Sequence, residues 1–202
     1  MEDVISLVKG AKVDLEKQAP GIHVFGIGCG WDPQSGSSSQ SFDLDVSVMM
    51  LGENGKMRTG KDLIFFNNLK SQCGSVIHEG DNLTGDGDGD DEVVWVDTAK
   101  VPADVKEMLF IINIYQGESK RQNFGQVKNS FIRVFDKAST GPKNGKGLPA
   151  ESIIRYDLNE DFSVETGITI GRLYRHNGVW KFEAVGTGER GGLDTYKQKY
   201  AA

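Results

Sequence analysis

The strongest constraint on the fold is an alternation of apolar and polar residues that turn signals interrupt at short intervals. Between residues 42 and 51 every second position is apolar, namely Phe42, Leu44, Val46, Val48 and Met50. Successive side chains of a β-strand point to opposite faces, so these five would share one buried face. The dipeptides Asn54-Gly55 and Asn177-Gly178 favour tight two-residue turns between antiparallel strands.

Further segments have the composition of strands, and few have the composition of helices. Strands are predicted at 4–8, 12–15, 22–28, 42–51, 63–66, 93–96, 109–115, 131–135, 153–158, 168–174 and 179–185. The first two could form a hairpin around Gly10. The nearly continuous apolar run at 109–115 is typical of a central strand covered on both faces. Short helices are expected only at 102–108 and 193–200.

Strands with so little helix between them predict a mainly β protein, an antiparallel β-sandwich with a few short helices. No linker separates two blocks, so we expect a single domain over residues 1–202. Its segment 138–150 is rich in glycine, proline and lysine and is interpreted as a mobile insertion loop.

The composition excludes several classes of protein. The chain is 38% hydrophobic and 26% charged, as in ordinary globular proteins. No apolar run reaches the roughly 18 residues of a membrane-spanning helix, and the amino terminus does not resemble a signal peptide. We therefore expect a cytoplasmic protein without an integral membrane segment. A net charge of −6 without a basic run argues against a nucleic-acid partner.

The negative charge is concentrated between residues 81 and 92, in the sequence DNLTGDGDGDDE. Six of these twelve residues are acidic and none is basic; without them the chain has 23 acids and 23 bases. Ca²⁺ takes six to eight oxygen ligands, and interspersed glycines let a loop bend around an ion. The spacing of Asp86, Asp88 and Asp90 begins like an EF-hand loop, but Asp91 stands where that loop needs glycine. This segment is therefore predicted to be a calcium-binding loop between strands, with an open, solvated acidic turn as the alternative.

A second pair of carboxylates, Asp43 and Asp45, lies two residues apart on a predicted strand. Both would leave the same face of the sheet, where they could share a cation with a nearby loop. Paired carboxylates could also perform acid–base chemistry, as in glycoside hydrolysis. Asp32 and Asn68 could each be a turn residue or a further oxygen ligand. No nucleophile motif is present, so we expect no enzyme, and Cys29 and Cys73 are expected to be free thiols.

Seven segments carry a resemblance to a known family: GIGCGWD (26–32), FDLDVS (42–47), DLIFFNN (62–68), HEGDNLTGDGDGDDE (78–92), RQNFGQVKNSFIRV (121–134), YDLNEDFSVET (156–166) and GRLYRHNGVWKFEAVG (171–186). They resemble segments of the TerD family of tellurite-resistance and stress-response proteins. Their order and spacing together are specific, and segment 138–150 departs from the pattern.

The resemblance implies a β-sandwich that binds one or two Ca²⁺ ions at one end and has no established catalytic reaction. The matching positions imply these ligands: Asp43, Asp45, Asp81, Asn82, Asp88, Asp90 and Asp91. Asp32 and Asn68 lie in family-like segments and are candidate further ligands. The expected role is tellurite resistance or general stress response, possible partners being other stress-response proteins.

Two alternatives stay open. The chain could bind a small ligand or cyclic nucleotide, with calcium completing the pocket. It could also be a metal-dependent hydrolase in which the acidic site activates water.

Overall fold

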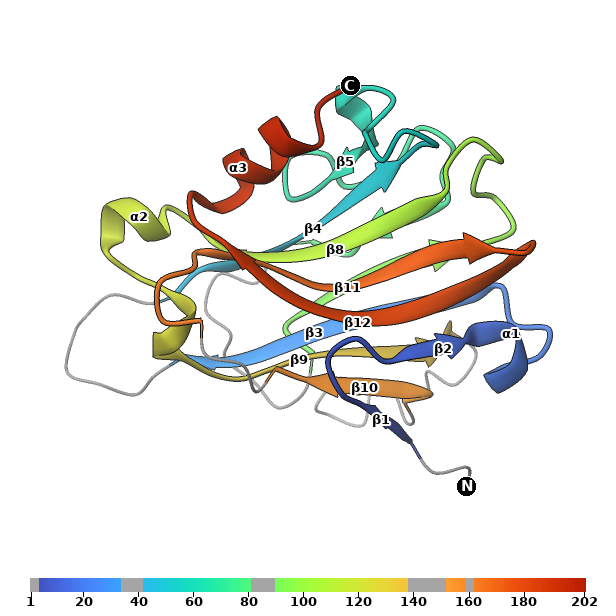
Figure 1. Ribbon diagram of the computed structural model, residues 1–202, viewed down its shortest axis with the longest axis horizontal. Helices are drawn as coiled ribbons and strands as arrows, with labels where there is room; N and C mark the ends of the chain where they lie inside the picture. The colour runs from blue at the N-terminus through green and yellow to red at the C-terminus, as the bar shows by residue number, and fades with distance from the viewer. Residues whose placement is uncertain (1–3, 34–41, 81–89, 138–151, 159–161) are drawn as a thin grey trace.

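Two six-stranded sheets packed face to face make up the protein, as the computed structural model shows (Figure 1). The structure describes residues 4–33, 42–80, 90–137, 152–158 and 162–202. Among the residues described, β1 and β10 pair in parallel, and every other pair of neighbouring strands is antiparallel. The predicted antiparallel sandwich is confirmed, whereas the predicted insertion loop at 138–150 lies outside the described residues.

The strands of the two sheets follow two orders. The first sheet has the order β1 (Ile5–Leu7), β10 (Ile154–Asp157), β9 (Val127–Asp136), β3 (Val24–Pro33), β7 (Glu92–Asp97) and β6 (Val76–His78). The second sheet has the order β2 (Lys12–Asp14), β12 (Val179–Glu189), β11 (Gly167–His176), β8 (Glu107–Ile114), β4 (Leu44–Leu51) and β5 (Leu63–Ile64).

The helices are short. They are α1 (Leu15–Gln18), α2 (Gly117–Lys120), α3 (Gly192–Lys199) and the 3₁₀ turns η1 (Gly60–Asp62) and η2 (Phe124–Gln126). None of the described helices is long and apolar enough to cross a membrane. The predicted terminal helix at 193–200 is confirmed by α3, which Figure 1 shows lying over the second sheet.

The helix predicted at 102–108 is wrong. This segment forms a turn, in which Val105 N–H donates to the carbonyl of Pro102 at 3.1 Å, and β8 begins at Glu107. Val105 is fully buried in the core. A helix this short has an unfavourable nucleus, and pairing of β8 with its neighbours prevails over it.

The hairpin predicted around Gly10 is also wrong, although both strands exist. β1 pairs parallel with β10 in the first sheet, and β2 pairs with β12 in the second. The chain changes sheets at Gly10, whose φ of +80° is a conformation that glycine adopts without strain. The Gly10 N–H donates to the carbonyl of Ala184 at 2.7 Å, which fixes this crossing.

The predictions for the core and the last hairpin are confirmed. The alternating apolar residues from Phe42 to Met50 all lie in the main core between the sheets. β8 is covered on both sides: Phe110 and Ile112 face that core, and Leu109 and Ile111 face a second cluster under α3. Asn177-Gly178 turns β11 into β12 with positive φ at both residues.

A buried pair of polar side chains joins the two sheets at the start of β4. β5 pairs only with Val48 and Met49, so β4 has an open edge at Val46. There the side chain of Glu92 accepts from the Val46 N–H at 2.7 Å, and Nε2 of His78 is 3.1 Å from the Val46 carbonyl. Side chains of the first sheet thus satisfy backbone groups of the second.

Replacing Glu92 should therefore weaken the fold. In Glu92→Ala the buried Val46 N–H loses its acceptor, which should lower the free energy of unfolding by about 2 kcal/mol in urea denaturation. Glu92→Gln keeps an acceptor oxygen and should lose less. Equal denaturation midpoints for all three proteins would show that this pair does not hold the sheets together.

Candidate metal centre

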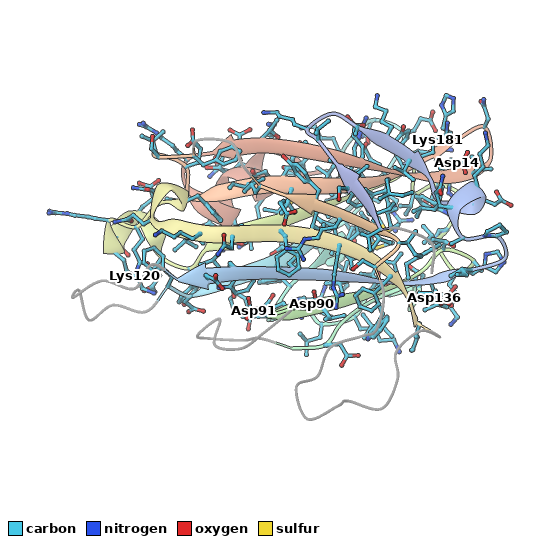
Figure 2. The ribbon with its side chains drawn as sticks, turned by 90° about the horizontal axis from the view of Figure 1, so that it is seen from below. Asp14, Asp90, Asp91, Lys120, Asp136 and Lys181 are labelled. Atoms are coloured by element: carbon cyan, nitrogen blue, oxygen red, sulfur yellow. The ribbon has the colours of Figure 1, made fainter. Side chains whose placement is uncertain are left out.

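The ends of three strands bring most of the predicted ligands to one region of the sandwich. β3 ends just after Asp32, β4 begins just after Asp43, and β7 begins just after Asp91. The pairing of Cys29 with Glu92 and the bond from Val46 N–H to Glu92 hold these three ends together. Figure 2 shows Asp90 and Asp91 close together, apart from Asp14 and Lys181 at one end of the molecule.

Asp91 is a half-buried carboxylate surrounded by other acids. One of its oxygens accepts from the Trp31 N–H at 2.8 Å, and its own N–H donates to the Cys29 carbonyl at 2.8 Å. Burial, with the negative charges of Asp32, Asp90 and Glu92, outweighs the Trp31 bond and raises the pKa of Asp91 to about 6. A cation beside Asp91 would relieve this repulsion.

Asp32 is the exposed neighbour of this group. One carboxylate oxygen of Asp32 accepts from Nδ2 of Asn129 at 2.6 Å, and its charge acts on Asp91. The structure thus brings Asp32 and Asp91 together, although they are far apart in sequence. This arrangement fits the oxygen ligands that Ca²⁺ prefers.

Asp90 differs from its neighbour because a cation of the protein already binds it. Arg133 donates through Nε to one Asp90 oxygen and through Nη2 to the other, both at 2.7 Å. The Asp90 side chain is only 3% exposed. Burial raises the pKa of Asp90, and the Arg133 bonds oppose that shift.

Asp45 leaves β4 on the face opposite Leu44, as the alternation predicts, and Asp43 directly precedes the strand. That face is not a solvent surface, because Asp45 is 3% exposed and α3 packs over the same side of the sheet. Nδ2 of Asn113, which lies opposite Asp45 in the β4–β8 register, donates to Asp45 at 3.3 Å.

Two buried oxygens near Asp45 were not predicted from the sequence. Oδ1 of Asn113 and Oγ of Ser47 are buried and have no hydrogen-bond partner among the described residues. Both residues face the same side of the second sheet as Asp45. Unpaired neutral oxygens beside a carboxylate are the chemistry that a bound cation satisfies. The sequence feature that could have indicated them is Asn113, the single amide side chain within the apolar run at 109–115.

His78 and Glu92 lie between the two acidic groups. Burial lowers the pKa of His78, but the hydrogen bond and charge of Glu92 outweigh it, and the Asp45 charge adds to them, so the pKa is raised. Nδ1 of His78 accepts from the Gly80 N–H at 3.1 Å. The charge of Asp45 therefore acts on His78, whose strand pairs with β7, the strand that begins just after Asp91.

Asn68 forms a turn through its side-chain nitrogen. Nδ2 donates to the Leu63 carbonyl at 2.6 Å, and the Asn68 backbone pairs with Phe65. Asp81, Asn82 and Asp88 lie outside the described residues. Within the described parts of the chain, no group of three or more His, Cys, Asp or Glu side chains could hold a metal ion. A complete calcium site would need ligands from segment 81–89 or from amide, hydroxyl and backbone oxygens.

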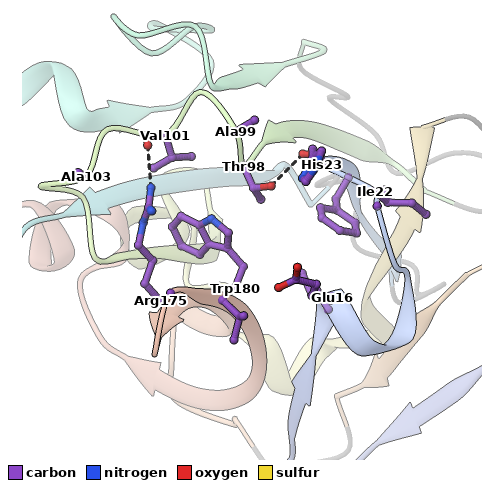
Figure 3. A pocket seen from close by; sticks show the side chains of 14 residues that line it. Glu16, Ile22, His23, Thr98, Ala99, Val101, Ala103, Arg175 and Trp180 are labelled. Carbon is purple, nitrogen blue, oxygen red and sulfur yellow. Dashed lines mark hydrogen bonds between the residues drawn. The ribbon is translucent and has the colours of Figure 1, made fainter.

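A pocket of about 340 Å³ lies away from these residues, at the start of β3 and the end of β7 (Figure 3). The Arg175 guanidinium lies 4.6 Å from the centre of the Trp180 ring and donates to the Val101 carbonyl at 2.7 Å. Glu16 is the one acid among the lining residues. This pocket therefore offers an aromatic surface rather than a second group of carboxylates.

Comparison with known proteins identifies the family. The model of the TerD domain matches residues 4–200. The chain belongs to the TerD domain family. One relative is General stress protein 16U of Bacillus subtilis (strain 168), which is 49% identical over 94% of this chain and 93% of that protein. Another is Tellurium resistance protein TerD of Alcaligenes sp, which is 46% identical over 97% of this chain and 96% of that protein.

A solved structure shows that the TerD fold is shared beyond close relatives. The crystal structure of a Streptomyces coelicolor A3(2) protein, described as a homologue of telluride resistance protein (TerD), superposes with a TM-score of 0.67. The two chains are 15% identical, and the match covers 90% of this chain and 100% of the other. At this identity the comparison supports the sandwich fold alone.

The raised pKa of Asp91 predicts a dependence of stability on pH. A carboxyl whose pKa is higher in the folded than in the unfolded chain stabilises the fold below about pH 4, and this contribution is lost as the pH rises through 6. With chelator present, Asp91→Asn should therefore gain stability relative to the unchanged protein between pH 4 and pH 7. Urea denaturation at each pH measures this; a difference independent of pH would contradict it.

Proposed function

We propose that this TerD-family chain is a calcium-binding module without catalytic activity that acts in tellurium resistance or general stress response in the cytosol. The observation that supports calcium most directly is the unfavourable position of the Asp91 carboxylate, where burial and the charges of Asp32, Asp90 and Glu92 raise its pKa to about 6. The names of two relatives support the biological role.

The proposed ligands fall into two groups. Asp32 and Asp91 would hold an ion on the first sheet, and Asp43, Asp45 and Asn113 would hold an ion at the start of β4. Asp81, Asn82 and Asp88 precede β7 in sequence and could supply carboxylate and amide oxygens to either group. A bound cation would neutralise the carboxylates, and these residues would then tie segment 81–89 to both sheets.

The alternation of β4 supports two ions rather than one shared ion. Asp45 faces the outer side of the second sheet, away from the core, whereas Asp91 contacts the backbone of β3 in the first sheet. Glu92 and His78 stand between them. Two separate ions, one for each group, therefore agree better with the positions of the carboxylates than one shared ion.

Calcium should raise the melting temperature, and chelator should reverse the rise. Binding to the folded state alone stabilises it by about 2.7 kcal/mol when free calcium is a hundredfold above the dissociation constant. Differential scanning calorimetry measures the shift, and titration calorimetry gives the stoichiometry. No heat and no shift in melting temperature would refute calcium binding.

Two double variants test the assignment of ligands. Asp43→Asn with Asp45→Asn, and separately Asp32→Asn with Asp91→Asn, should each remove one of two ions from the titration. Asp194→Asn is the control, because this exposed carboxylate pairs only with Lys197 on α3 among the described groups. A pair of substitutions that leaves stoichiometry and affinity unchanged would remove that pair from the site.

Binding of a small ligand is the second candidate function. The pocket in Figure 3 has the volume and the aromatic surface for part of a small organic molecule. Calorimetry with cyclic AMP, with and without calcium, tests the cyclic-nucleotide form of this hypothesis. Heat that disappears in Trp180→Ala would support it, and no heat in either condition would refute it.

A further inference from the structure

Asp90 and Arg133 form a closed, buried contact beside the proposed calcium ligands. The two parallel hydrogen bonds of 2.7 Å use both oxygens of Asp90. The third nitrogen of Arg133, Nη1, donates to Oγ of Ser152 at 3.1 Å, and the guanidinium lies 4.9 Å from the centre of the Phe135 ring. The arginine side chain is 10% exposed, so its geometry is fixed on several sides.

A glycine of β3 makes this contact possible. Gly28 pairs with Val93 of β7 on one side and with Arg133 of β9 on the other, so Asp90 must cross β3 to reach the arginine. A Cβ atom at Gly28 would lie 2.3 Å from Cγ of Asp90, closer than real atoms approach. The space left by the missing side chain is the space that the Asp90 carboxylate occupies.

Asp91, the next residue, lies among other acids instead. Its carboxylate accepts from the backbone of Trp31 and has the charges of Asp32 and Glu92 nearby. The two adjacent carboxylates thus have opposite surroundings. An arginine neutralises Asp90, whereas other acids surround Asp91.

We propose that Arg133 is a built-in cation that holds Asp90 across Gly28, so that Asp90 positions the calcium site and Asp91 acts as a ligand. This inference rests on the calcium-binding function proposed above. The contact with Arg133 fixes the position of Asp90, and with it that of the adjacent Asp91, directly before β7. Because a bond to calcium would leave a buried guanidinium without its carboxylate, Asp90 keeps its arginine when the ion binds.

The substitution Arg133→Gln separates this role from that of a ligand. If Asp90 positions the site, calcium affinity falls in Arg133→Gln, by about tenfold as for other residues that orient metal ligands. If Asp90 is itself a ligand for which Arg133 competes with the ion, the affinity rises. An increase, or no change, overturns the proposal.

Further variants keep the test valid if Arg133→Gln fails to fold. Gly28→Ala retains every charge but displaces Asp90, and should also weaken calcium binding. Asp90→Asn with Arg133→Gln pairs two neutral amides and should bind calcium better than Arg133→Gln alone. Unchanged affinity in Gly28→Ala, or a further loss of affinity in the double variant, overturns the proposal.

Arg172→Gln is the matched control for lost stability. Arg172 is likewise an arginine paired with carboxylates, but on the second sheet, where it bonds Glu183 at 2.7 Å and Glu107 at 2.9 Å. This variant should unfold at lower urea concentration and bind calcium with unchanged affinity. An affinity loss as large as that of Arg133→Gln would show that lost stability alone weakens binding, and would overturn the proposal.

Measurements with chelator keep this inference distinct from the proposed function. If the unchanged protein gives no heat with calcium, calcium binding fails as a function. The proposed contact of Arg133 with Asp90, called here the Asp90 anchor, then still predicts that Asp90→Asn lowers the denaturation midpoint in chelator, whereas Asp91→Asn does not. Equal midpoints for Asp90→Asn and the unchanged protein overturn the anchor, whatever calcium does.

Discussion

One buried polar contact links the two sheets at the open edge of β4, where two side chains of the first sheet reach the backbone of Val46. A strand edge inside a protein is unfavourable unless its N–H and C=O groups find partners. Here β5 is too short to cover the edge, and Glu92 and His78 replace it. The same contact sets the distance between the acidic end of β3 and the acidic start of β4, so the shape of the core and the shape of the candidate site have a common origin.

Much of the fold could be predicted because it depends on local pattern. The alternation from Phe42 to Met50 indicates which face of the strand is buried, and Asn177-Gly178 indicates where the chain reverses. Neither indication depends on distant parts of the sequence. The errors lie where pairing is not local. Gly10 looks like the centre of a hairpin, but the partners of its flanking strands are more than 130 residues away, as the register of Ile5 with Ile154 shows.

The candidate site was predictable in its chemistry and less so in its geometry. The acidic composition of 81–92 and the spacing of Asp43 and Asp45 identified the residue types, and the comparison of charges along the chain located them. Nothing in that spacing says that Arg133 meets Asp90, because the two come together only through the β3–β9 register. Nor does it say that α3 packs over the outer side of the second sheet or that Asp45 on that side is buried.

The pairing of the chain ends has a consequence for how the protein is made. β1 and β2, which are synthesised before the other described strands, need β10 and β12 as partners, and the cluster that covers Met49 and Leu51 needs Leu193 and Tyr196 of α3. Contacts of such sequence separation form slowly because a long loop must close first. The first sheet can therefore be completed only after β10 is synthesised and the second only after β12, so β1 and β2 lack their native neighbours while most of the described strands are made.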